Sequence, residues 1–291
     1  MAGQGLDGPA RRGEPTDMAD SPTAHGLDGV ARTLLTPLYA RAHAARFVPE
    51  SSFRDPLAAD LLARTGYADP EVIRDRPNML GGLHRGMVFD ALTEAFVAEH
   101  PTATVVSAGI GLCTRNHRLA ERAPGVRWVG VDTSEVIALR RRLLPDEDIT
   151  LRAASITEPD WARGLPGADG PVLVLAEGVL MYLAPDGVRT CLDAIRATFG
   201  PGTELAADYF HPKLAHSDRH PIVKATGARF LFGVRNGAGL AQHAPGWSLV
   251  REHGVMERLN PTQRVAAYAA RALTLGGRAY AVAQLRAHAR P

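Results

Sequence analysis

The feature that most constrains the fold is a regular alternation of short apolar runs with amphipathic segments between residues 103 and 210. Apolar, β-branched runs of this length predict strands at 103–109, 127–132, 149–155, 171–177 and 203–210. The segments between them carry helical patterns, because parallel neighbours need a crossover connection. The alternation predicts an α/β fold, a doubly wound and mostly parallel sheet covered on both faces.

The chain before this alternation has a different texture. Residues 1–29 are rich in Gly, Pro, Asp and Ala and poor in large apolar residues, so we predict a disordered tail. A helical N-terminal segment should follow, with a proline at its start or at a kink. The expected helices cover 30–47, 53–65 (capped by Asp55) and 84–100.

The chain after the last parallel strand changes character again. Residues 211–246 mix helix and loop patterns, and we expect them to form a substrate lid. Two later runs predict strands at 247–256 and 278–287, separated by a helix at 261–275. These strands should form an antiparallel hairpin on one side of the sheet. No linker follows the tail, so a single domain is expected over 30–291.

Composition excludes several classes of protein. Lys and Arg total 33 against 31 Asp and Glu, and no basic stripe with interleaved aromatic residues occurs, which disfavours nucleic-acid binding. Cys113 and Cys191 provide neither a disulfide framework nor a metal cage, and the histidines lack ligand spacing. With no signal peptide or membrane span recognised, we expect a cytoplasmic protein without metal or membrane partner. The oligomeric state stays open.

A glycine turn and an acidic residue suggest a nucleotide-like cofactor. Gly109 and Gly111 follow the first strand, and Asp132 ends the second strand about twenty residues later. Glycine lets the backbone approach a ligand closely, and a strand-end carboxylate accepts both hydroxyls of a ribose. NAD and S-adenosylmethionine (SAM) share this arrangement.

Two further positions favour SAM over NAD. Thr114 stands where the NAD fingerprint has a third glycine for close packing of helix on strand. Glu177 ends the fourth strand, where SAM would place its ammonium and sulfonium groups. An NAD-dependent oxidoreductase stays as the alternative on this pattern.

Several segments resemble the leucine carboxyl methyltransferase family and, within it, the bacterial branch of tetracenomycin-type polyketide O-methyltransferases. They are "TLLTPLYARA", "FRDPLAADLL", "AGIGLCTRNHRL", "VGVDTSEVIALRRRLL", "LAEGVLMYL" and "RHPIVKATGARFLFG", which together run from Thr33 to near the C-terminus. The resemblance implies a Rossmann-like, class I SAM-dependent methyltransferase of bacterial secondary metabolism.

The resemblance also implies roles for individual residues. Arg85 would pair with the methionyl carboxylate of SAM, and Gly109 would meet the methionyl group through its backbone. Asp132 would bind the ribose hydroxyls, and Glu177 would face the amino group. The adenine would lie between Ser155 and Ile156.

The chain departs from the family pattern inside the glycine turn. Cys113 stands where the family usually has Asp, which removes a charge and a hydrogen-bond acceptor beside the cofactor. Ile110 replaces Ala and could narrow the turn, and Ser155 replaces the Asp that many members have. A catalytically silent protein with the same fold is therefore a further alternative.

The acceptor is the remaining question. A carboxylate is already ionised at neutral pH, so it needs a cation to orient it and no base. A hydroxyl needs a base within hydrogen-bond reach. Arg41 or Arg229 would orient a carboxylate, His211 would serve a hydroxyl, and the full set of candidates is Tyr39, Arg41, Tyr182, Asp208, His211, Arg229 and Arg235.

The catalytic residues selected from this set are Tyr182, His211 and Arg41. Apolar Phe230, Leu231 and Phe232 would either contact a hydrophobic acceptor or pack on the sheet. We predict a SAM-dependent O-methyltransferase acting on the carboxylate of a small, polyketide-like molecule, with hydroxyl methylation as the alternative.

Overall fold

A seven-stranded sheet organises the structure. This computed structural model describes residues 33–65, 75–215, 227–255 and 277–289, together with 257, 264–265, 268–269, 271–272 and 274. The predicted tail at 1–29 lies outside the described residues, and so does most of the predicted helix at 261–275.

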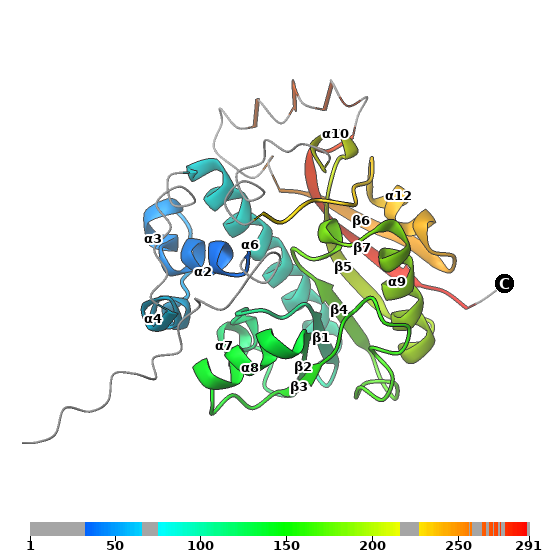
Figure 1. The fold of residues 1–291 in the computed structure, drawn as a ribbon, viewed down its shortest axis with the longest axis horizontal. Helices are drawn as coiled ribbons and strands as arrows, with labels where there is room; N and C mark the ends of the chain where they lie inside the picture. Colours follow the sequence, from blue (N-terminus) through cyan, green and yellow to red (C-terminus); the bar gives the residue numbers. More distant parts are fainter. Residues whose placement is uncertain are drawn as a thin grey trace, which may run out of the picture.

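The strand order confirms the predicted doubly wound topology. It is β3-β2-β1-β4-β5-β7-β6, in which β1 to β5 pair in parallel and the last two strands pair antiparallel (Figure 1). The predicted hairpin thus closes one side of the sheet. The strands are β1 (Thr104–Ala108), β2 (Arg127–Asp132), β3 (Thr150–Ala153), β4 (Val172–Ala176), β5 (Glu204–Phe210), β6 (Trp247–Gly254) and β7 (Tyr280–Ala287).

Both faces of the sheet are buried, as the continuous apolar runs predicted. Val105 of β1 belongs to a cluster with Phe89 of helix α6 (Arg76–Glu99). The next residue, Val106, belongs to a cluster on the other face with Ile195 of helix α9 (Pro185–Phe199). Because successive side chains of a strand point to opposite faces, a strand that is covered on both sides is apolar at nearly every position.

The N-terminal helices form an apolar cluster that is separate from the two clusters on the faces of the sheet. They are α2 (Leu35–Ala42), α3 (Ala44–Phe47) and α4 (Pro56–Thr65). Leu38 and Leu61 pack in one cluster with Leu112, which follows the glycine turn, and with Leu139 of α8 (Ser134–Leu143). Figure 1 shows α2 and α3 beside α6, and α4 next to α2.

Local sequence signals fix where these helices begin. Asp55 accepts a hydrogen bond of 3.0 Å from the backbone N–H of Ala58, which confirms it as the cap of α4. Pro37 lies in the first turn of α2, where its missing N–H costs no helical hydrogen bond.

The segment after β5 packs against the sheet where the structure describes it. It contains α10 (Pro212–Ala215) and α12 (Gly237–His243), while 216–226 lie outside the described residues. The backbone N–H groups of Leu231 and Phe232 donate to Met181 O at 2.8 and 3.2 Å. The sequence left open whether these aromatic residues contact an acceptor or pack on the sheet. Phe230 and Phe232 are buried, which favours packing. The lid function of 211–246 stays a prediction.

Candidate active site

A cavity of about 420 Å³ opens at the carboxyl ends of the parallel strands. It lies beside β1 and β4, between which the order of the sheet reverses, the place where doubly wound sheets bind ligands. The structure brings nine of the ten predicted site residues to its lining: Arg41, Arg85, Gly109, Gly111, Asp132, Ser155, Ile156, Glu177 and Tyr182.

The glycine turn is shaped by backbone hydrogen bonds and by a close approach. The N–H groups of Gly109 and Ile110 donate to Val131 O at 2.8 and 3.0 Å, so the turn is attached to β2. Gly109 has a φ of 79°, and a Cβ placed on it would lie 2.4 Å from Cγ2 of Val179. Only glycine fits this position, and its bare backbone forms the floor of the cavity.

The two departures from the family pattern leave this turn intact. The Ile110 side chain is buried over Gly130, where a Cβ would lie 2.4 Å from Ile110 Cδ1. Glycine in β2 therefore makes room for the larger side chain. Cys113 lines the cavity, and Arg115 Nη1 approaches its sulfur at 3.5 Å.

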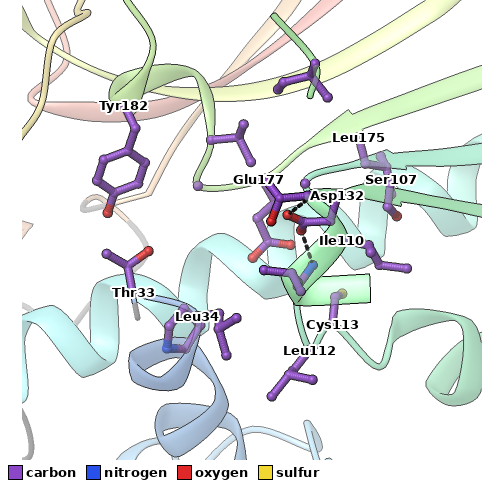
Figure 2. Close-up of a pocket in the computed structure, with 18 of the residues that line it drawn as sticks. Thr33, Leu34, Ser107, Ile110, Leu112, Cys113, Asp132, Leu175, Glu177 and Tyr182 are labelled. Atoms are coloured by element: carbon purple, nitrogen blue, oxygen red, sulfur yellow. Dashed lines mark hydrogen bonds between the residues drawn. The ribbon is translucent and has the colours of Figure 1, made fainter. Parts of the chain in front are cut away.

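Asp132 is held with its carboxylate at the cavity (Figure 2). Its Oδ2 accepts from Gly111 N and its Oδ1 from Thr133 N, both at 2.8 Å. Burial raises the pKa of Asp132, although these two bonds favour the charged form. A carboxylate oxygen has a second lone pair, so the group keeps acceptors for a diol such as a ribose.

Glu177 sits between two arginines at the other side of the turn. Arg85 Nε donates to its Oε1 at 3.1 Å, and Arg115 Nη2 donates to its Oε2 at 2.6 Å. Burial alone would raise the pKa of Glu177, but the two guanidinium groups lower it to about 2. The residue is therefore a permanent carboxylate, suited to facing a cationic group.

Arg85 is itself fixed from behind. Its Nη1 donates to Tyr280 Oη at 3.0 Å and to Asp208 Oδ2 at 3.4 Å, and Tyr280 donates to the same oxygen at 2.6 Å. Asp208 is fully buried, which raises its pKa, and it also accepts from Gly178 N at 2.6 Å. Asp208 does not line the cavity, contrary to its place among the acceptor candidates; it positions Arg85 instead.

Arg41 reaches the cavity from α2 by a similar device. Its Nε donates to Asp55 Oδ2 at 3.0 Å and its Nη2 to Leu112 O at 2.7 Å. Burial opposes the charge on Asp55, but Arg41 and Arg118 outweigh it and lower the pKa of this carboxyl. The residue that the sequence showed as a helix cap therefore also orients a cation of the site.

The far end of the cavity is mainly apolar. Figure 2 shows the Tyr182 hydroxyl directed at Thr33, with which it shares a side-chain hydrogen bond. Burial raises the pKa of Tyr182 to about 12, so its hydroxyl is a hydrogen-bond donor and not a base at ordinary pH. The lining here is Thr33, Leu34, Pro37, Arg41, Val179, Tyr182 and Leu183.

His211 does not meet the cavity. It is 3% exposed, and its ring lies against Gly277. Burial lowers its pKa. The hypothesis that His211 serves the acceptor as a base is therefore not supported by the geometry. The other candidates that do not line the cavity are Tyr39, Arg229, Arg235, Phe230, Leu231 and Phe232.

Sequence reasoning missed Arg140, which supports the glycine turn from below. It is fully buried, and its Nη1 donates to the carbonyl oxygens of Gly111 and Cys113 at 2.9 and 2.8 Å. Glu147 pairs with it at 2.5 Å. A helical signal was present, because Arg140 lies four residues after Val136, on the buried face of α8.

The fold and the cavity together define a doubly wound α/β protein with a site for a nucleotide-like cofactor. The sequence model of the leucine carboxyl methyltransferase family matches residues 35–196, and the chain belongs to this family. This membership confirms the predicted class of enzyme, a SAM-dependent methyltransferase.

Individual relatives agree with that assignment. The chain is 33% identical to the tetracenomycin polyketide synthesis O-methyltransferase TcmP of Streptomyces glaucescens, over 77% of this chain and 84% of that protein. It is 29% identical to the SAM-dependent methyltransferase dpfgK of Gibberella zeae, over 76% and 80%.

Solved structures show the same fold. A Thermobifida fusca protein aligns with a TM-score of 0.57 at 17% identity, over 90% of this chain and 96% of that chain. A DUF574 family protein of Streptomyces avermitilis aligns with a TM-score of 0.53 at 16% identity, over 86% and 97%.

Two kinds of feature are absent from the described residues. No helix there is long and apolar enough to cross a membrane. In the same part of the chain, no three His, Cys, Asp or Glu side chains gather where they could hold a metal ion.

Proposed function

We propose that this chain transfers the methyl group of SAM to a carboxylate oxygen of a small, polyketide-like molecule. The observation that carries the proposal is the makeup of the acceptor end of the cavity. Among the lining residues that come from 33–41 and 179–183, the polar side chains are the cation Arg41, the phenol donor Tyr182 and Thr33, and none is His, Asp or Glu. That set orients a carboxylate but cannot deprotonate a hydroxyl.

The cofactor residues fit SAM. Gly109 and Gly111 line the cavity with backbone that carries no side chain, so a ligand can approach it closely, and the adjoining carboxylates match the two ends of the ligand. Asp132 would hold the ribose hydroxyls, Ser155 and Ile156 would flank the adenine, and Glu177 would face the amino group. SAM supplies a methyl group on a positively charged sulfur, which is a good leaving group.

Arg85 is suited to the methionyl carboxylate. Three of its bonds go to Glu177, Asp208 and Tyr280, while its Nη2 makes no hydrogen bond to the described residues. A donor that is both oriented and unused costs little reorganisation when it meets an anion.

At the acceptor end, the protein contributes orientation and exclusion of water. Arg41 and the Tyr182 hydroxyl would hold the acceptor carboxylate so that one oxygen faces the methyl group in line with the bond to sulfur. Leu34, Pro37 and Leu183 would cover the apolar body of the acceptor. The similarity to TcmP, an O-methyltransferase of polyketide synthesis, supports this acceptor class.

Calorimetric titration with SAM and, separately, NAD tests the cofactor. We expect SAM to bind and NAD not to bind. Asp132→Ala should abolish SAM binding, whereas Glu135→Ala, an exposed residue of the same cavity, should change it little. Absence of SAM binding in a folded wild-type protein would favour the catalytically silent alternative.

The acceptor is tested with matched aromatic carboxylic acids and phenols and with methyl-labelled SAM. Mild alkali releases labelled methanol from a methyl ester but not from a methyl ether. Base-labile product from the acids supports the proposal. Base-stable product from the phenols would replace it with hydroxyl methylation.

A further inference from the structure

Arg115, the first residue of α7 (Arg115–Leu119), uses every nitrogen of its guanidinium inside the protein. It is 3% exposed. Its Nη2 donates to Glu177 at 2.6 Å, its Nε donates to Asp90 Oδ1 at 2.7 Å, and its Nη1 approaches the Cys113 sulfur at 3.5 Å. A planar group held at three corners cannot rotate, so it presents one fixed direction to Glu177.

The anchor of Arg115 is also immobilised. Asp90 of α6 receives Arg118 Nη2 on both oxygens, at 2.9 and 3.1 Å, and Arg118 Nε at 3.2 Å. The Phe89 ring lies 5.5 Å from the Arg115 guanidinium carbon. We call Arg85, Asp90, Arg115, Arg118, Glu177 and Asp208 the ion-pair network.

Glu177 has two arginine partners, and only one of them has a donor left for the cofactor. Arg85 holds Oε1 at 3.1 Å, yet it has an unused donor and is the residue assigned to the cofactor carboxylate. Arg115 holds Oε2 at 2.6 Å, and its other two nitrogens are taken by Asp90 and Cys113, so none is left for the ligand. When Arg85 engages the cofactor, Arg115 is the partner that keeps Glu177 in place.

We infer that Arg115 is a positioning residue that fixes the Glu177 carboxylate toward the amino group of the cofactor, with Asp90 as its anchor. This inference rests on the proposed function, because Glu177 needs a fixed orientation only if it meets that amino group. Arg115 acts through Glu177 and is not itself a catalytic residue.

Removal of Arg115 should make SAM binding depend on pH. The charged groups that face Glu177 are Arg115 of α7, Arg85 of α6, Arg41 of α2 and Asp208 of β5. With Arg115 removed, burial and Asp208 raise the pKa of Glu177 against two remaining arginines. Protonation at mildly acidic pH would then remove its attraction for the amino group, so SAM affinity should fall as the pH falls.

The test compares Arg115→Gln with Arg122→Gln, a change at an exposed arginine near α7 that pairs with Glu94 and lies outside the ion-pair network. SAM dissociation constants are measured by calorimetry between about pH 5 and about pH 8, the range above the ordinary pKa of a Glu. We expect Arg115→Gln to weaken SAM about ten- to hundredfold, and more at the acidic end. Wild type and Arg122→Gln should vary little with pH, and Arg122→Gln, which keeps every histidine, also controls for histidine titration.

A second probe separates positioning from a merely structural effect. 5′-Methylthioadenosine carries the adenosine part of the cofactor but no amino acid group. We expect its affinity to be the same in wild type and Arg115→Gln. Arg115→Lys, which keeps the charge if the Gln variant does not fold, should retain a flat pH profile with weaker SAM binding.

Three other outcomes would each overturn the inference in a distinguishable way. Equal SAM affinity and pH profile in wild type and Arg115→Gln would overturn it while leaving the proposed function. An equal loss for SAM and 5′-methylthioadenosine would also overturn it, because the effect would be structural. If wild type binds no SAM at all, the proposed function fails, and this inference fails with it.

Discussion

The two ends of the cavity are built on opposite principles. At the cofactor end, the ion-pair network, Asp132 and Arg140 hold nearly every polar group by hydrogen bonds to other elements. At the acceptor end, the walls come from residues 33–41 and 179–183, are mostly apolar, and contain Tyr182 and Arg41 as the main polar side chains. One end has fixed geometry, and the other has a permissive surface.

This difference predicts which substitutions should alter cofactor binding and which should alter the choice of acceptor. Buried charges cost several kcal/mol each unless every partner is present, so a network of them tolerates little change. Apolar surface discriminates weakly between ligands of similar size. Changes at the cofactor end should therefore affect stability and SAM affinity, and changes at the acceptor end should affect acceptor selection.

The largest effect is expected from Arg140→Met. The substitution leaves Glu147 buried without its main partner and frees the carbonyl groups of Gly111 and Cys113. Breaking a buried ion pair costs about 3–5 kcal/mol, so we expect this loss in urea unfolding. The neighbouring exposed residue gives a matched control, Arg141→Met, which should change stability by about 0.5 kcal/mol or less. Similar losses in both variants would show that the turn needs no support.

The unfolding free energy at acidic pH should depend on the paired carboxylates at the cofactor end of the cavity. Burial raises the pKa of both Glu147 and Glu177, but polar partners outweigh it and lower each pKa from 4.5 to about 2. The partners are His117 and Arg140 for Glu147, and arginines for Glu177. A folded pKa below the unfolded value stabilises above pH 4.5, and this contribution is lost as the pH falls through about 2. The pKa values of Asp132 and Asp208 are raised, so ionisation of these two carboxyls lowers the free energy of unfolding as the pH rises.

Glu147→Gln should therefore flatten this pH dependence, by about 3 kcal/mol over the window. The measurement is unfolding free energy against pH. Glu135→Gln, an exposed residue at the cavity, should leave the slope as it is in wild type. An unchanged slope in Glu147→Gln would argue against a charged, paired carboxylate there.

Gly109→Ala should weaken SAM binding by about five- to a hundredfold, the equivalent of about 1–3 kcal/mol of backbone strain. Gly109 combines a positive φ with a distance of 2.4 Å between the Cβ position of an alanine there and Val179 Cγ2. Gly200→Ala is the control, because Gly200 has a φ of 77° and nothing within 4 Å of such a Cβ. Val179→Ala added to Gly109→Ala should restore part of the affinity. No restoration would mean that strain alone matters.

The smallest effect is expected at the acceptor end, from Tyr182→Phe. Loss of one hydrogen bond should lower kcat/KM for the acceptor about two- to tenfold and leave the SAM dissociation constant unchanged. Because the pKa of Tyr182 is about 12, the variant and the wild type should share one pH profile below that value. Tyr39→Phe, buried away from the cavity, should change neither constant. If Tyr182→Phe weakened SAM binding as much as it lowered kcat/KM for the acceptor, the two ends of the cavity would not be functionally distinct.

Much of the cofactor end could be predicted from local patterns. Strand-end positions carry Asp132 and Glu177 to one edge because parallel strands end together, and the apolar runs reveal those ends. Asp55 was visible as a helix cap from its proline neighbour. The opposite result holds for His211, which also follows a strand end but turns into the protein beside Gly277. Sequence places a residue at the end of a strand without giving the direction of its side chain.

The sequence by itself determined the doubly wound sheet, the glycine turn and the carboxylates at the strand ends, because each depends on periodicity or spacing within a few residues. Only the tertiary structure decided which arginines are buried and with which carboxylates they pair. Arg115 and Asp90 are 25 residues apart, and Arg115 and Glu177 are 62 apart. Pairs at such separations leave no periodic signal, and in a chain with many arginines the packing of α6, α7 and β4 alone selects them.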